Sequence, residues 1–110
     1  MIKTSGKLTH TLEGGLLTLK PTGEIDHHSA VAMREEADAI IYRTRPEVLA
    51  IDLSSIEFMD SSGLGFIMGR YKLARNLNCK TVIKNPGVRV SKILALAGME
   101  RIIKIERDQK

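Results

Sequence analysis

The chain has 110 residues, of which 43% are hydrophobic and 27% charged, a balance typical of a folded globular protein and not of a disordered one. We expect a single domain over residues 1–110, because two separate cores in so short a chain would each need disulfides or metals. The one cysteine, Cys79, excludes an intramolecular disulfide and favours a reducing, cytoplasmic setting.

Charge and apolar patterning argue against two classes of partner. The net charge is +4, but the basic residues are scattered, and two Tyr, two Phe and no Trp offer few rings to stack on bases. No apolar run approaches the ~20 residues that span a bilayer, and residues 1–7 lack the apolar stretch of a signal peptide. We therefore expect a soluble, cytoplasmic protein that binds neither nucleic acid nor membrane directly.

The first third of the chain predicts two strands and a helix. Residues 8–20 have the pattern of a β-hairpin with its turn at Gly14-Gly15. The second strand of this hairpin is expected to end near Pro21. Asp26 then precedes apolar residues at helical spacing, which predicts Asp26 as the N-cap of a helix that runs to about Tyr42.

The rest of the chain alternates strands and helices. The compact apolar run Val48–Ile51 predicts a central strand covered on both faces. Residues 54–60 are expected to form a turn. The later elements are a helix from Ser61 or Ser62, a strand at Thr81–Ile83, a helix that ends at Gly98, a strand at Ile102–Ile105 and a solvated tail, Arg107–Lys110.

The resulting order is strand, strand, helix, strand, helix, strand, helix, strand. It predicts an α/β fold with a mixed, mostly parallel sheet whose antiparallel edge is the N-terminal hairpin. Because parallel strands end on the same edge of a sheet, residues 23–28 and 59–63 are expected to be neighbouring loops.

Asp60-Ser61-Ser62-Gly63 has two interpretations at this edge. Asp and Ser are preferred N-caps, so the segment can simply begin a helix. Alternatively, a serine hydroxyl is held where the positive end of a helix favours an added phosphate, and Gly63 leaves the approach open. Such a serine could accept a phosphate without unfolding its own domain.

A small hydrolase is a competing hypothesis. It would use Ser61 or Ser62 as nucleophile, His27 or His28 as base, and Asp26 or Asp60 as the group that orients the base. The Gly-x-Ser-x-Gly elbow is absent, however. The pair His27-His28 has no nearby third Cys or His ligand, so we expect no metal site and no cofactor.

Two segments resemble the anti-sigma factor antagonists of the STAS domain family. Residues 58–65, followed by 69–72, are similar to the family's signature, and residues 23–28 are similar to its other marked loop. The resemblance extends over nearly the whole chain, through Ile51-Asp52-Leu53-Ser54 to Gly98-Met99. Two motifs in the right order, on loops expected to be neighbours, make it specific.

The resemblance implies a non-enzymatic regulator of transcription, with sporulation as the expected pathway. The unmodified protein would capture an anti-sigma factor serine kinase and so release a sigma factor, and phosphorylation on Ser61 would switch this binding off. A serine phosphatase would then remove the phosphate. By the same resemblance the partner-binding residues would be Asp26, His27, Asp60, Ser61, Ser62, Gly63 and Leu64. A general stress-response pathway and a nucleotide-binding STAS module remain alternatives.

Overall fold

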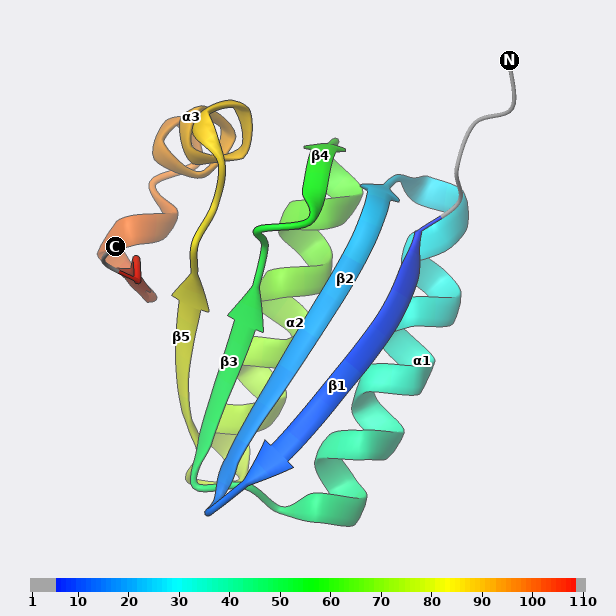
Figure 1. Cartoon of the computed structure of the whole chain (residues 1–110), viewed down its shortest axis with the longest axis vertical. Helices are drawn as coiled ribbons and strands as arrows, with labels where there is room; N and C mark the ends of the chain where they lie inside the picture. The colour runs from blue at the N-terminus through cyan, green and yellow to red at the C-terminus, as the bar shows by residue number, and fades with distance from the viewer. Residues whose placement is uncertain (1–5, 109–110) are drawn as a thin grey trace.

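The structure, a computed structural model that describes residues 6–108, is an α/β fold built on one six-stranded sheet (Figure 1). Its elements are β1 (Lys7–Glu13), β2 (Leu16–Ile25), α1 (His27–Thr44), β3 (Val48–Asp52), β4 (Ile56–Met59), α2 (Ser61–Asn76), β5 (Lys80–Lys84), α3 (Val88–Leu96), the 3-10 turn η1 (Met99–Arg101) and β6 (Lys104–Glu106). The predicted α/β class is confirmed, and β4 and η1 are added to the predicted order.

The sheet has the strand order β1-β2-β3-β5-β6, which places β3 in the middle, and β4 pairs with β2 off this path. Among the strands of residues 6–108, only β1 and β2 pair antiparallel; the other pairs are parallel. Gly14 and Gly15 have φ angles of 54° and 82°, the left-handed values that a tight two-residue hairpin turn needs. The predicted antiparallel hairpin edge is therefore confirmed.

The second strand does not close near Pro21, as the sequence predicted, but continues to Ile25. Proline has no N–H to donate to a neighbouring strand. In β2, Pro21 lies between the stretch that pairs with β3, which ends at Leu19, and the stretch that pairs with β4, which begins at Gly23. The proline is tolerated because no partner strand adjoins it on that side.

The central strand is covered by helices on one face only, which corrects the expectation of two covered faces. Figure 1 shows α1 and α2 together behind the sheet. Leu49 and Ile51 belong to the core and are fully buried, whereas Val48, Ala50 and Asp52 line a hollow of about 420 Å³ on the opposite face. Ala50 is nevertheless only 3% exposed, so this face is buried at its centre although no helix covers it. An apolar run of four residues therefore does not show whether helices cover both faces of a strand or only one.

Residues 54–60 contain a strand that the sequence pattern did not predict. β4 pairs in parallel with the end of β2, so that Ile25 lies opposite Met59. The strand has four residues with both inner ones exposed, and it therefore lacks the alternation that identifies a half-buried strand. This short strand is what places the start of α2 beside the end of β2.

The C-terminal part follows the prediction with one shift. Gly98 adopts the expected left-handed conformation, with φ of 70°, directly after α3 and its C-cap. The last strand is shorter than expected because η1 precedes it. Arg107 and Asp108 are exposed, and the Asp108 N–H donates a hydrogen bond of 2.8 Å to Asn85 Oδ1; the rest of the predicted tail lies outside the described residues.

Within residues 6–108, no helix combines the length and apolar character needed to cross a bilayer.

Candidate functional site at the N-terminal ends of α1 and α2

The two loops singled out in the sequence lie side by side, as predicted. The Asp60 N–H donates a hydrogen bond of 3.3 Å to the carbonyl oxygen of Ile25, the residue that precedes Asp26. The contact is made through β4, which pairs with the end of β2, and not through β3 as the topology argument assumed. Two helices therefore begin next to each other, and each begins with an aspartate.

The start of α1 is a closed capping box, which confirms Asp26 as the N-cap. Asp26 Oδ1 accepts the Ser29 N–H at 2.9 Å, and Ser29 Oγ accepts the Asp26 N–H at 3.2 Å. The buried Ser29 hydroxyl also donates to the Glu24 carbonyl oxygen at 3.1 Å. At this helix start the serine hydroxyl is fully used by the fold.

The start of α2 is capped differently. Asp60 is the N-cap, and its Oδ1 accepts the Ser62 N–H at 2.7 Å. Ser61 is the first residue of the helix and is exposed. Within residues 6–108, neither the Ser61 nor the Ser62 hydroxyl makes a hydrogen bond. Capping is thus done by the aspartate, and the fold has no structural use for the Ser61 hydroxyl.

The next two residues of the motif face inward. Gly63 is buried, and a Cβ atom built on it would lie 2.5 Å from Met59 Cβ, so that only glycine fits against β4. This corrects the expectation that Gly63 leaves the approach to the serine open. Leu64 is partly buried and packs against the hydrophobic core. Both residues position the start of α2 more than they extend the exposed surface.

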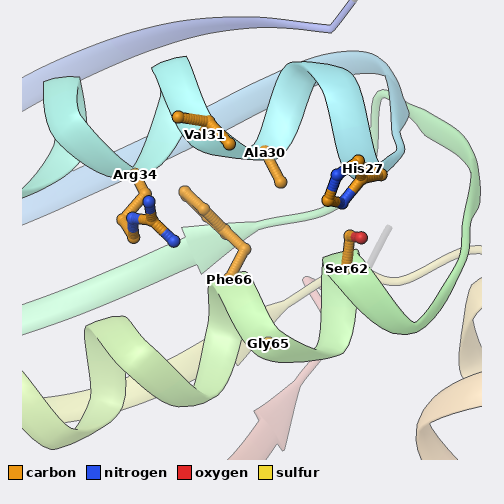
Figure 2. Close-up of a pocket in the computed structure, with 7 residues that line it drawn as sticks. All are labelled: His27, Ala30, Val31, Arg34, Ser62, Gly65 and Phe66. Atoms are coloured by element: carbon orange, nitrogen blue, oxygen red, sulfur yellow. The ribbon is translucent and has the colours of Figure 1, made fainter.

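A groove of about 230 Å³ lies between α1 and α2 and is lined at one end by Ser62, the residue that follows Ser61. Figure 2 shows that the His27 and Ser62 side chains face each other at one end, while Arg34 and Phe66 lie at the other. The groove is lined by His27, Ala30, Val31, Arg34, Ser62, Gly65 and Phe66. Both histidines are exposed, but His27 lines this groove and His28 does not.

The sequence reasoning missed Val31 and Arg34. Positions 27, 31 and 34 follow the spacing of one helix face, so the face could have been extended from His27 by counting helical turns. Neither apolar periodicity nor a motif marks these two positions, because Val31 and Arg34 are exposed and belong to no motif.

Beyond the groove an ion pair ties the two helices together. Arg70 Nε lies 2.8 Å from Asp38 Oδ1, and Arg70 Nη1 donates to the Phe66 carbonyl oxygen at 3.3 Å. The pKa of the Arg70 guanidinium is lowered, chiefly by burial; Asp38 opposes this shift and the positive charge of Arg34 adds to it. The Asp38 carboxylate thus stabilises Arg70 in a largely dry environment.

The hydrolase arrangement expected from the sequence does not form in the structure. Within the described residues, no hydrogen bond joins Ser61 or Ser62 to His27 or His28, the contact that marks a nucleophile–base pair. The Asp60 carboxylate is engaged with the helix backbone. No group of three or more His, Cys, Asp or Glu side chains that could hold a metal ion is present in residues 6–108.

Comparison with known proteins gives matches over nearly the whole chain. The STAS domain family matches residues 8–110. The anti-sigma F factor antagonist of Paenibacillus polymyxa is 35% identical over 91 residues, which cover 83% of this chain and 78% of that protein. The anti-sigma-B factor antagonist of Listeria monocytogenes is 32% identical over 85 residues, which cover 76% of this chain and 73% of that protein.

Solved structures show the same fold. The anti-sigma factor antagonist SpoIIAA in its unphosphorylated form matches with a TM-score of 0.81 and 21% identity, covering 94% of this chain and 90% of that one. The Bacillus cell fate determinant SpoIIAA in the phosphorylated form matches with a TM-score of 0.73 and 21% identity, covering 96% and 93%.

Proposed function

Because the chain belongs to the STAS domain family, and within it to the anti-sigma factor antagonists, we propose that it captures an anti-sigma factor serine kinase and so releases a sigma factor. The kinase phosphorylates Ser61, which ends the capture, and a serine phosphatase restores the unmodified protein. The chain itself performs no catalysis. It acts in the cytoplasm, with the sigma factor.

One observation carries this proposal: the Ser61 residue is exposed at the N-terminus of a helix, and its hydroxyl makes no hydrogen bond in the part of the chain that the structure describes. A phosphate can be added there without breaking a hydrogen bond of the folded protein. The positive end of α2 favours the added charge. That SpoIIAA, a structural match, was solved in phosphorylated and unphosphorylated forms supports such a switch.

The partner surface we propose is the edge where the two helices start. Its residues are Asp26, His27, Asp60, Ser61 and Ser62, with Leu64 and the buried Gly63 positioning the start of α2. Phosphate on Ser61 adds about −1.5 to −2 charge next to Asp60 and near Asp26. Covering this clustered negative charge with a partner costs several kcal/mol, and each ~1.4 kcal/mol is a tenfold loss of affinity.

The similarity to an anti-sigma-B factor antagonist favours a second candidate pathway, a general stress response instead of sporulation. Both pathways use the same chemistry at Ser61, so they differ only in which kinase binds. A nucleotide-binding role is less well supported at this edge, because the groove beside Ser62 holds about 230 Å³, below the ~300–1,000 Å³ of common small-molecule sites.

The test is a binding measurement with purified anti-sigma F and anti-sigma-B kinases. We expect the wild-type chain and Ser61→Ala to bind one of them, and Ser61→Asp to bind it at least about tenfold more weakly. Ser54→Asp is the matched control, because Ser54 is also exposed but lies before β4. Equal binding by Ser61→Asp and the wild type would contradict the switch.

A further inference from the structure

The groove between α1 and α2 is kept open by a residue that the fold does not need. A Cβ atom built on Gly65 would meet no atom within 4 Å, in contrast to Gly63 two residues earlier. Gly65 has ordinary helical geometry, and glycine within a helix is less stable than alanine. Packing and backbone conformation therefore do not explain a glycine at position 65. A bound group that occupies the space beside Gly65 would explain it.

The groove has a defined chemistry. Phe66, Ala30 and Val31 give it apolar walls, and Arg34 supplies a positive charge at one end (Figure 2). No acidic residue among those that the structure describes lines it. Within residues 6–108, Arg34 has no ion-pair partner, and the Asp38 carboxylate one turn further along α1 lies 2.8 Å from Arg70 instead. The groove is thus complementary to an apolar group that carries, or adjoins, a negative charge.

The volume of the groove indicates whether a small molecule or a single side chain fits it. At about 230 Å³ it is smaller than the ~300–1,000 Å³ of sites that enclose a cofactor or a drug-sized ligand. It also continues into the proposed partner surface, because Ser62 and His27 belong to both. One side chain of a docked protein fits these two facts better than a free small molecule.

We propose that the groove seats one apolar side chain of the anti-sigma kinase against Phe66 and over Gly65, with a neighbouring carboxylate of the kinase paired to Arg34. The inference rests on the proposed function and names its recognition chemistry. The groove also adjoins the switch: Ser61 precedes Ser62, which lines the end of the groove opposite Arg34, so a dianion on Ser61 adds negative charge where the partner must approach.

Filling the groove tests the apolar part. Gly65→Leu occupies the space that the kinase side chain needs, and we expect its affinity for the anti-sigma kinase to fall at least about tenfold with no loss of melting temperature. Gly69→Leu is the matched control, because a Cβ on Gly69 also meets nothing within 4 Å and Gly69 does not line the groove. We expect Gly69→Leu to bind like the wild type.

Reversing the charge tests the polar part. Arg34→Glu should weaken binding of the same kinase by about tenfold or more, and the loss should shrink at high salt. Lys72→Glu makes the same change of charge at an exposed position of α2 outside the groove and should leave the affinity within about twofold.

Three results would overturn the inference alone while the proposed function stands. They are wild-type affinity in both Gly65→Leu and Arg34→Glu, equal losses in Gly65→Leu and Gly69→Leu, and a loss in Arg34→Glu that is matched by a change in self-association measured by sedimentation. Failure of the wild-type chain to bind or to be phosphorylated by either purified kinase would overturn the proposed function and this inference together.

Discussion

The N-termini of α1 and α2 contain the same residue types in different roles. Each helix begins with an aspartate N-cap followed within three residues by serine. In α1 the Ser29 hydroxyl is buried and makes two hydrogen bonds, to Asp26 and Glu24. In α2 the Ser61 hydroxyl is exposed and, within residues 6–108, makes none. One serine is part of the fold, and the other is available for chemistry.

The difference shows why a capping motif alone does not settle function. A serine at a helix start is most simply explained by capping, and this explanation is correct for α1. At α2 the Asp60 carboxylate caps the helix alone, and within residues 6–108 neither serine hydroxyl closes a capping box as Ser29 does in α1. The informative observation is therefore which hydroxyl the backbone leaves unused, and this depends on side-chain geometry.

The largest expected effect separates the two serines by phosphorylation. After incubation with the anti-sigma kinase and ATP, Ser61→Ala should take up no phosphate, because the only acceptor in our proposal is absent. Ser29→Ala should still be phosphorylated, since Ser29 is not part of the acceptor site. Intact-mass spectrometry of both variants provides the measurement. If the Ser61→Ala variant took up as much phosphate as the wild type, Ser61 would not be the acceptor, and the proposed difference in role between Ser61 and Ser29 would be wrong.

The next effect concerns stability at the start of α2. Gly63→Ala forces a methyl group against Met59, and overpacking of this kind costs about 1–3 kcal/mol of the free energy of unfolding. Gly65→Ala is the control on the same helix and should gain up to about 1 kcal/mol, because its added methyl group meets open space. Urea denaturation of both variants measures the difference, and equal stabilities would contradict the packing assigned to Gly63.

Removing the buried Ser29 hydroxyl should have a comparable or smaller effect. Ser29→Ala leaves the Glu24 carbonyl oxygen and the Asp26 N–H without this partner, and we expect a loss of about 1–3 kcal/mol in the free energy of unfolding. Ser61→Ala, which removes no hydrogen bond, should change it by less than about 0.5 kcal/mol. Thermal or urea denaturation that ranks Ser61→Ala as the less stable variant would reverse the comparison.

The smallest effect on stability tests whether Asp26 does more than cap. Asparagine is as good an N-cap as aspartate, so Asp26→Asn should leave the free energy of unfolding unchanged within about 0.5 kcal/mol, whereas Asp26→Ala should lose about 0.5–2 kcal/mol. Both variants lose the carboxylate charge from the proposed partner surface, and both should capture the kinase more weakly. Full kinase binding by Asp26→Asn, measured by calorimetry, would leave Asp26 with the capping role alone.

The sequence predicted those parts of the molecule that local rules determine. The hairpin on Gly14-Gly15, the Asp26 N-cap and the left-handed Gly98 follow from turn and capping preferences of a few residues. The rule that parallel strands end on one edge of a sheet correctly predicted that the two marked loops are neighbours, although it was applied to β3 and the contact is made through β4.

What the sequence did not predict depends on tertiary contacts. β4 is too short to show a period, and its existence depends on the end of β2 being free to pair with it. The hollow over the face of β3 that no helix covers, and the groove at Arg34, both depend on which side of the sheet the helices occupy. The use of Gly63 for packing against Met59 is likewise visible only in three dimensions.

The most direct test of the central claim is to locate the phosphate on the wild-type chain. The purified protein would be incubated with the anti-sigma kinase and ATP, digested, and sequenced by tandem mass spectrometry. Our account predicts a single phosphate on Ser61, the hydroxyl that the fold leaves unused. Phosphate on Ser62, or a chain that stays unmodified while it is bound to an active kinase, would contradict it.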